Sequence, residues 1–220
     1  MLFAKRSSED DTVVAMLASA LRRDIAFGAL RPDEKLRIDA LRQRYGGSNH
    51  SMRETLRILA TEGLVEATNQ RGFRVTSATN EDLQDILLMR IEIERIGLSR
   101  SLEFGGVDWE AAVIAAHHRL AHADAEVLRQ PDDVTALQWD EACRTFSASL
   151  ISACQSPRLI EMAGRFFDQS RRFRLARLRE GRIDFDARGT RHTGIKAAII
   201  ARDTAAALEA LEQDIRADIE

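Results

Sequence analysis

Apolar side chains recur at the spacing of a helical stripe in three segments of the first third of the chain. In residues 11–28 they stand three and four positions apart, which places them on one face of a helix. Residues 37–45 and 48–63 show shorter stripes of the same kind. Glycine stands at the end of each stripe, as is usual where a helix stops. The pattern predicts three short helices.

After the third predicted helix, the apolar pattern changes from helical spacing to alternation. Leu64, Val65 and Ala67 precede a polar turn, and Phe73 and Val75 alternate with polar neighbours after it. Two short alternating runs around a turn predict a two-stranded hairpin. Three helices followed by a hairpin, within about 75 residues, indicate a winged helix-turn-helix.

The remaining residues return to helical spacing and show no strand alternation. Glycines and prolines divide them into six segments, each long enough for a bundle helix. Because the composition shifts after Ser77, we expect two domains, residues 1–77 and residues 78–220. The predicted fold class is mainly α, with an N-terminal winged helix-turn-helix and a C-terminal all-α helical bundle. The expected bundle helices are residues 80–104, 108–129, 132–154, 157–180, 185–202 and 204–219.

The composition is that of a folded chain, with 45% hydrophobic and 30% charged residues. No apolar run reaches the roughly 20 residues of a membrane span, so no membrane partner is expected. Cys143 and Cys154 lie inside apolar-periodic segments, and no signal-like stretch opens the chain. These observations favour the reducing cytoplasm.

The formal net charge of −3 is unevenly distributed. Residues 1–78 carry 13 Lys and Arg against 10 Asp and Glu, and the acidic excess lies in the remainder. A mildly basic first third indicates that this part of the chain contacts a polyanion.

The first turn of the third predicted helix is rich in short polar side chains. In a helix-turn-helix, this turn contacts base edges in the major groove. Asn49 could hydrogen-bond an adenine, and Arg53 could reach a guanine or a phosphate. At the hairpin, Gly72 permits close approach to the minor groove, and Arg71 suits its negative potential. The predicted DNA-binding residues are Ser48, Asn49, His50, Ser51, Arg53, Arg71 and Gly72.

A purely structural interpretation of these residues is also open. Ser48 and Ser51 can serve only as capping residues, and Arg53 can be a solvated surface charge. Glu54 fits a helix-start network or an ion pair with a basic neighbour. The presence of Arg53 together with an arginine and a glycine at the hairpin tip favours DNA binding.

Two motifs in the predicted winged domain support the same function. The first motif is G-x-L-x-P at residues 28–32, followed by Leu36. The second motif, in residues 48–65, consists of Ser48, Arg53-Glu54, Leu56, Leu59 and the sequence E-G-L-V at residues 62–65. Residues 24–75 thus resemble the DNA-binding domain of GntR-type bacterial transcription regulators. This chain departs from the family pattern at four positions, with Asp33 for glycine, Gly47 for an apolar residue, Asn49 for arginine and Ser51 for proline. These departures affect the base preference and leave the assignment to DNA-binding regulators unchanged.

Three further motifs lie in the helical remainder. Arg90, Ile93 and Glu94 form R-x-x-I-E, residues 146–159 read F-S-A-S-L-I-S-A-C-Q-S-P-R-L, and an H-x-x-I run begins at His192. These motifs resemble the FCD effector domain of the FadR subgroup of the same regulators. The resemblance implies a homodimer on a palindromic operator of double-stranded DNA. It also implies a repressor that a small carboxylate effector controls by binding inside the bundle.

The same resemblance raises the question of a metal. In this family, an Asp or His, a His one helical turn later and two further histidines usually bind a divalent ion. The corresponding positions here are Cys143, Ser147, His192 and Asp214. Serine is a poor ligand, whereas the other three are accepted zinc ligand types. No cofactor is therefore certain, and a metal-dependent sensor or enzyme using Cys143, His192 and Asp214 stays open as the alternative.

Without a metal, an anionic effector needs another cation. Arg90, Arg95, Arg172 and Arg174 could form a bidentate carboxylate clamp, and Arg90 leads because it lies on an apolar stripe. No Gly-rich phosphate loop and no activated nucleophile motif is present, so an enzyme is not expected. The predicted effector-binding residues are Arg90, Cys143, Ser147, Arg174, His192 and Asp214.

A second group of histidines is formed by His117, His118 and His122. Adjacent residues point in different directions on a helix, so His117 cannot share a face with the other two. We interpret this group as scattered surface residues.

Overall fold

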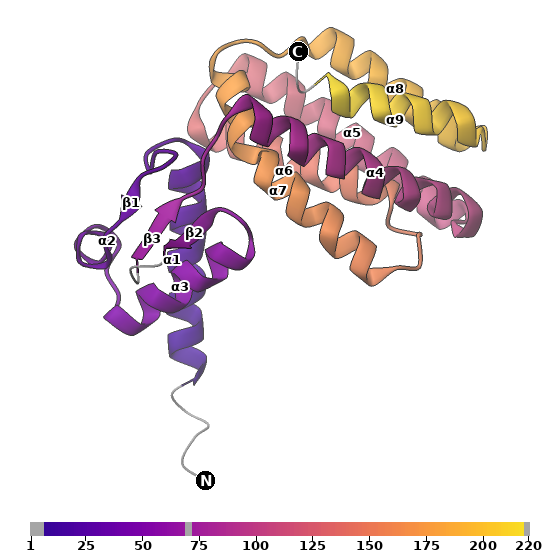
Figure 1. The fold of residues 1–220 in the computed structure, drawn as a ribbon. Coiled ribbons are helices and arrows are strands. Elements are labelled where there is room, and N and C mark those ends of the chain that lie inside the picture. Colours follow the sequence, from indigo (N-terminus) through magenta and orange to yellow (C-terminus); the bar gives the residue numbers. More distant parts are fainter. Residues whose placement is uncertain (1–6, 69–71, 218–220) are drawn as a thin grey trace. The chain divides into compact units, whose positions relative to one another are not determined.

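The protein is described by a computed structural model, which covers residues 7–68 and 72–217 (Figure 1). The chain divides into two compact units, residues 1–79 and residues 80–220. Each unit contains buried apolar side chains of its own.

The first unit is a winged helix-turn-helix, as the sequence predicts. Its strands form an antiparallel sheet in the order β1-β3-β2, with Val65 opposite Val75 and Lys35 opposite Arg74. Strand β1 is not predicted, because two residues are too few to show alternation. The elements are α1 (Ser7–Ala26), β1 (Lys35–Leu36), α2 (Ile38–Tyr45), α3 (Asn49–Thr61), β2 (Val65–Thr68) and β3 (Gly72–Val75).

The core of the first unit fixes α3 against α1 and the sheet. Leu21 of α1, Met52, Leu56 and Leu59 of α3, and Val75 of β3 have no measurable exposure and belong to one cluster. Burial of a side chain of this size contributes about 1.5–3 kcal/mol. The apolar stripe of α3 therefore holds that helix by one face and leaves its opposite face to solvent.

A buried carboxylate links α1 to α2. Asp24 accepts hydrogen bonds from the hydroxyl of Tyr45, at 2.6 Å, and from the guanidinium of Arg44. Burial and the bond to Asp24 raise the pKa of Tyr45 above its ordinary value. This network holds the C-terminal turn of α2 close to α1, so it positions the turn that leads into α3.

Two departures from the family pattern lie in left-handed backbone. Gly46 and Gly47 have φ values of 81° and 82°. A Cβ at Gly47 would lie 3.0 Å from Leu17 Cδ1 and 3.0 Å from Ser51 Oγ, so a larger side chain there would require these neighbours to shift. Asp33, which stands where the pattern has glycine, also has a positive φ of 63°. That conformation is the one glycine adopts without strain.

The second unit is a bundle of helices, again as predicted. Within it, α4 packs on α7 and α9, α5 packs on α6 and α8, and α8 packs on α9 (Figure 1). Helix α6 ends before the expected residue 154, because Ile151 leaves helical geometry with φ −107° and ψ 3°. The helices are α4 (Asn80–Phe104), α5 (Val107–Arg129), α6 (Asp133–Leu150), α7 (Pro157–Arg179), α8 (Phe185–Ile200) and α9 (Thr204–Arg216).

The bundle buries charged side chains as well as apolar ones. Arg90 and Glu94 of α4, Asp140 of α6, Arg174 of α7 and His192 of α8 are all buried. Burial of a charge is costly unless the charge is paired and hydrogen-bonded. A concentration of buried ionisable groups inside one bundle therefore marks a candidate binding site.

Candidate nucleic-acid interface and effector cavity

Helix α3 begins with a reciprocal cap. The Ser51 amide donates to Ser48 Oγ at 3.0 Å, and the Ser48 amide donates to Ser51 Oγ at 2.9 Å. Ser51 is only 2% exposed. The prediction that Ser51 contacts DNA is therefore corrected, because its hydroxyl is used in the cap and its side chain is buried.

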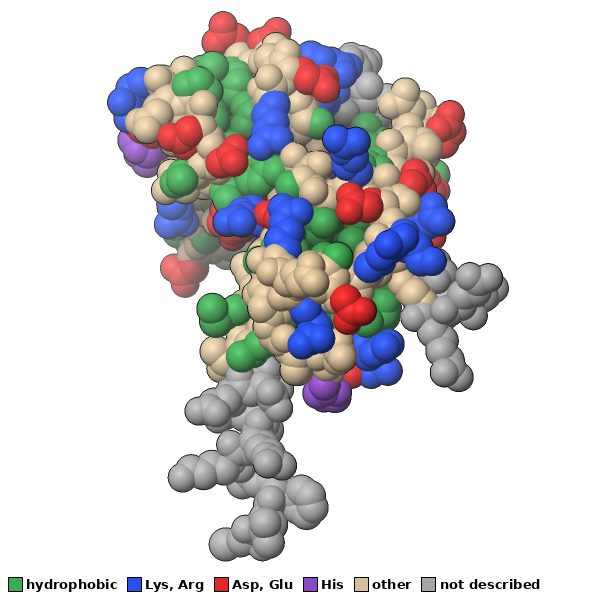
Figure 2. All heavy atoms as spheres, turned by 90° about the vertical axis from the view of Figure 1, so that its left-hand side faces the viewer, with side chains coloured by type: hydrophobic (Ala, Val, Ile, Leu, Met, Phe, Trp, Pro, Cys, Tyr) green, Lys and Arg blue, Asp and Glu red, His purple; other side chains and the backbone are tan. Residues whose placement is uncertain are grey.

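The other predicted residues of this turn face solvent. Asn49, His50 and Arg53 are exposed, and Asn49 Oδ1 accepts a hydrogen bond from Arg42 Nη1 at 3.3 Å. The structure thus leaves an amide, an imidazole and a guanidinium on the exposed first turns of α3. Figure 2 shows basic and acidic side chains interspersed on the face drawn there, without one large patch of a single sign.

Glu54 follows the interpretation as an ion-pair residue. Its carboxylate accepts from the guanidinium of Arg57, one turn further along α3. It takes no part in the helix cap, which Ser48 and Ser51 complete between them.

The wing is formed by β2 and β3. Gly72 is the first residue of β3 and lies opposite Thr68. Arg71, the other predicted wing residue, lies outside the described residues. Behind the strands, Arg74 Nη1 donates to the carbonyl of Asp33 at 3.1 Å, which ties β3 to the segment before β1.

All six predicted effector-binding residues line one cavity inside the bundle. The structure brings together Arg90 from α4, Cys143 and Ser147 from α6, Arg174 from α7, His192 from α8 and Asp214 from α9, and adds the unpredicted Glu94 and Arg188. The cavity volume is about 30 Å³. That is enough for a water molecule or two and far below the size of an organic acid.

A buried ion pair forms the α4 side of this cavity. Arg90 Nε donates to Glu94 Oε1 at 2.7 Å, and the two side chains are 5% and 1% exposed. Ser147 Oγ donates to the second oxygen of Glu94 at 2.9 Å. The guanidinium of Arg90 also lies over the ring of Phe167, 4.8 Å from its centroid. Ser147 is thus a hydrogen-bond donor to Glu94.

The α7 side carries a second buried pair. Arg174 Nε donates to Asp140 Oδ1 at 2.8 Å, and Arg174 Nη1 donates to Ser170 Oγ at 3.0 Å. Arg171 pairs with the other oxygen of Asp140. Arg174 is therefore held in place by two partners while it faces the cavity.

Arg188 supplies a cation that the sequence analysis missed. Its Nη1 donates to Asp124 at 2.9 Å, and its Nη2 lies 3.0 Å from the sulfur of Cys143. Burial raises the pKa of the Cys143 thiol to about 11, although Arg188 and Arg174 oppose that shift. The thiol is thus protonated at neutral pH, and the positive charge beside it is that of arginine.

His192 and Asp214 form the last side of the cavity. His192 Nε2 lies 3.2 Å from Asp214 Oδ2, and Arg191 Nε donates to Asp214 Oδ1 at 3.1 Å. Burial alone would raise the pKa of Asp214, but His192, Arg188 and Arg191 together hold it below its usual range. Asp214 is therefore a carboxylate held by a histidine and an arginine.

These contacts do not fit a metal ion at the four family positions. Ser147 donates to Glu94, Asp214 is paired with Arg191, and the guanidinium of Arg188 stands at the sulfur of Cys143. Across residues 7–68 and 72–217, there is no group of three or more His, Cys, Asp or Glu side chains that could hold one. In this structure the four family positions are thus engaged with other protein groups.

The two remaining arginine candidates lie elsewhere. Arg95 pairs with Glu212 of α9, and Arg172 pairs with Asp82 of α4. Neither lines the cavity, so the structure does not place them with Arg90 and Arg174.

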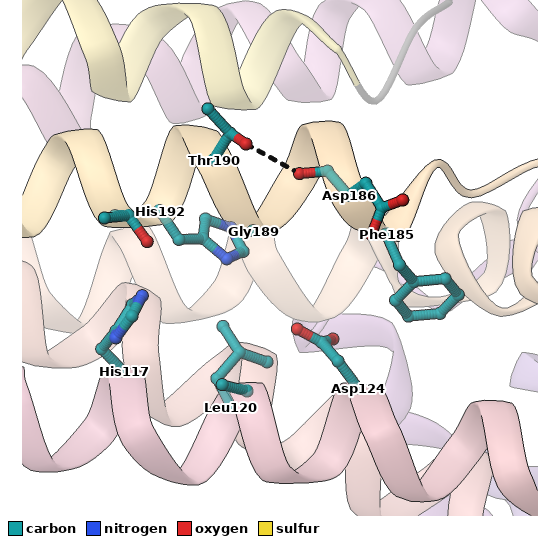
Figure 3. A pocket seen from close by; sticks show the side chains of 10 residues that line it. His117, Leu120, Asp124, Phe185, Asp186, Gly189, Thr190 and His192 are labelled. Atoms are coloured by element: carbon teal, nitrogen blue, oxygen red, sulfur yellow. Dashed lines mark hydrogen bonds between the residues drawn. The ribbon is translucent and has the colours of Figure 1, made fainter.

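His117 does not follow the interpretation as a scattered surface residue. It is half-buried, with its ring centroid 5.8 Å from that of Phe146, whereas His118 and His122 are exposed. Figure 3 shows His117 of α5 and His192 of α8 at one open pocket of about 420 Å³ between these helices. Burial, together with Lys196 and His192, lowers the pKa of His117. His192 therefore borders both this pocket and the inner cavity.

Comparison with known proteins decides the class. The profile of bacterial regulatory proteins of the gntR family matches residues 14–75, and the FCD domain profile matches residues 85–217. The chain belongs to the gntR family of transcription regulators. GntR-family regulators bind DNA, and FCD domains bind small-molecule effectors.

Individual relatives support the assignment to the gntR family. The HTH-type transcriptional repressor GlaR of Escherichia coli (strain K12) is 34% identical over 198 residues, which cover 89% of each chain. The uncharacterized HTH-type transcriptional regulator BphR of Paraburkholderia xenovorans (strain LB400) is 33% identical over 201 residues, 90% of this chain and 80% of that one. The solved structure of E. coli McbR/YncC has the same fold, with a TM-score of 0.72 at 18% identity over 93% of each chain.

The described part of this gntR-family chain contains no helix whose length and apolarity would allow it to cross a membrane.

Proposed function

We propose that this regulator is a homodimeric repressor that binds a palindromic operator and is controlled by a small carboxylate bound in the bundle. The observation that carries the proposal is the convergence of Arg90, Arg174, Arg188 and His192 on one buried cavity of an FCD domain. Arginine forks are suited to carboxylates because two parallel N–H groups match the two oxygens.

The cavity is closed around its own carboxylates. Glu94 pairs with Arg90, Asp140 with Arg174 and Asp124 with Arg188, and Asp214 lies 3.2 Å from His192, so the three arginines and the imidazole each already face an acid. A carboxylate effector enters by exchanging for one of these internal acids, and the helices must separate to admit it. Binding is therefore coupled to a rearrangement among the bundle helices that carry these pairs, α4 to α9.

DNA recognition is assigned to the exposed turn of α3 and to the wing. Arg53 and Asn49 are the groups on that turn that can form two hydrogen bonds with a base edge. Ser48 contributes by capping the helix, which fixes the position of Asn49 and His50 next to it. Gly72 and Arg71 are proposed to contact the minor groove at the wing.

Control of DNA binding follows from linkage. An effector that binds better to one arrangement of the bundle than to another shifts the population toward that arrangement. If the favoured arrangement no longer spaces the two α3 helices to match the half-sites, operator affinity falls by the ratio of the two effector affinities. A couple of kcal/mol of differential binding is sufficient for a response of about 30-fold.

The metal-dependent sensor or enzyme is the weaker candidate. A nucleophilic Cys143 would need a lowered pKa, and burial raises it instead. The hydrogen bonds of Ser147, Asp214 and Arg188 leave the family's metal positions occupied by protein contacts.

Fluorescence anisotropy on a labelled duplex from upstream of its own gene tests DNA recognition. The expected result is salt-sensitive, sequence-dependent binding that Arg53→Ala weakens by about 1–3 kcal/mol. Arg165→Ala, which removes an exposed arginine of α7, is the matched control and should leave the affinity unchanged. Equal affinity for the upstream duplex and for a scrambled one would reject the regulator assignment for α3.

A further inference from the structure

A second pocket in the bundle is lined largely by arginine. It lies where α7 ends and α8 begins and has a volume of about 300 Å³; among the residues that the structure describes, Asp184 is the one acid that lines it. That carboxylate accepts from the amide of Ala187 at 2.9 Å, so it caps α8. We name this pocket the arginine vestibule; its cationic lining residues are Arg174, Arg177, Arg182, Arg188 and Arg191.

Two of these arginines, Arg182 and Arg191, pair with acids that do not line the vestibule. Arg191 Nε donates to Asp214, which lines the inner cavity, and Arg182 Nη1 donates to Glu180 at 3.1 Å. A guanidinium has five N–H donors in a planar fork, and a single carboxylate uses one or two of them. Arg182 and Arg191 therefore keep donors for a further anion. Their side chains are 56% and 28% exposed, so a solute can reach them.

The vestibule and the inner cavity share two lining residues. Arg174 and Arg188 line both, and the vestibule has about 300 Å³ where the cavity has about 30 Å³. A molecule that reaches Arg90 and His192 past Arg174 or Arg188 therefore leaves its other end beside Arg182 and Arg191.

We propose that the vestibule is a second anion site of the bundle, in which Arg182 and Arg191 bind a carboxylate or phosphate group. The effector is then a molecule with two acid groups, one in the inner cavity and one in the vestibule. The inner half of this assignment rests on the proposed function, whereas the vestibule itself rests on its five arginines.

Isothermal titration calorimetry on the full-length protein tests the assignment. The probes are the straight-chain dicarboxylates from malonate to adipate, monocarboxylates of the same chain lengths, and inorganic phosphate. At least one dicarboxylate should bind more tightly than its monocarboxylate. Arg182→Gln and the double variant Arg182→Gln/Arg191→Gln should weaken binding of dicarboxylates and phosphate about tenfold or more, because each removes a charge-assisted hydrogen bond. Monocarboxylate binding should stay within about twofold in Arg182→Gln, whose acidic partner Glu180 lies outside the cavity.

The controls separate this proposal from the function on which its inner half rests. Arg165→Gln, which alters an exposed arginine paired with Glu161 on α7, should leave all affinities unchanged. Phosphate binding that requires Arg182 supports the vestibule even where no monocarboxylate binds, a result that would count against the inner site alone. Dicarboxylates that bind no more tightly than monocarboxylates, with phosphate indifferent to both substitutions, would overturn the vestibule while leaving the inner site intact.

Discussion

Breaking the buried pair of Arg90 and Glu94 should destabilise the bundle strongly. Glu94→Gln keeps the shape of the side chain and an oxygen that can accept from Ser147, but it removes the charge opposite Arg90. With Nε and Oε1 at 2.7 Å, the charge centres are about 4 Å apart, and at an effective dielectric constant of about 20 their attraction is about 4 kcal/mol. The hydrogen bond from Ser147 is present in both forms, so it does not change the difference. We therefore expect a loss of about 4 kcal/mol in the free energy of unfolding.

Urea unfolding followed by tryptophan fluorescence measures this loss in the bundle alone. Both tryptophans of the chain, Trp109 and Trp139, lie in residues 80–220, so the signal does not report on the winged unit. Arg90→Met and the double variant Arg90→Met/Glu94→Gln complete a double-mutant cycle. Because the double variant leaves no unpaired charge from this pair, its loss should be smaller than the sum of the single losses by about 2 kcal/mol. A loss below about 1 kcal/mol in Glu94→Gln, or additive losses in the cycle, would refute the reasoning.

Three further predictions follow from particular contacts. Gly47→Ala should destabilise the winged unit more than Gly46→Ala does. Both glycines have a positive φ, which costs alanine about 1–2 kcal/mol, but only Gly47 is also crowded by neighbouring side chains. Hydrogen exchange of the α3 amides measures the difference in stability, and equal losses in the two variants would contradict the prediction. Asp33→Gly should stabilise the same unit by up to about 1 kcal/mol, because glycine adopts this φ without strain; slower exchange of the Val75 amide checks it, and faster exchange would count against it. The pKa of Asp214 is lowered in the folded protein, so its carboxylate stabilises the bundle above about pH 4, and this contribution is lost as the pH falls through the folded-state pKa. Asp214→Asn should therefore reduce the fall in the free energy of unfolding at acid pH, measured by urea unfolding. An unchanged dependence of that free energy on pH would exclude this role.

The sequence was sufficient for most of the fold because its helices have clear apolar stripes and glycine or proline at their ends. Strand β1 could not be predicted, since Lys35 and Leu36 form a strand only by pairing with β3, far away in the sequence. Helix α6 ends early because the backbone of Ile151 leaves helical geometry, although the apolar pattern continues beyond it. Local periodicity encodes neither the pairing of β1 with β3 nor this change of backbone conformation.

For the cavity too, the residues that were missed are those whose surroundings depend on packing between helices. The six predicted positions lie on different helices that no spacing rule connects, so they could be predicted together only through the family resemblance. Glu94 and Arg188 escaped prediction because an acid and an arginine on a helix are usually solvated. Only packing shows that Glu94 is buried against Arg90 and that Arg188 is 12% exposed beside Asp124. Ser51 was assigned to DNA because its place on the first turn of α3 does not reveal that its side chain is 2% exposed and bonded to Ser48.

The central claim is that a carboxylate in the bundle changes the affinity of the winged units for DNA, and reciprocal titration tests it most directly. Operator affinity is measured by anisotropy with and without a saturating carboxylate, and carboxylate affinity is measured by calorimetry with and without saturating operator. Linkage requires both ratios to be the same, and we expect a factor of at least about 5. His192→Ala should bring both ratios toward one while leaving the affinity for operator alone intact. Ratios of one for every carboxylate that binds the wild-type protein would contradict the account.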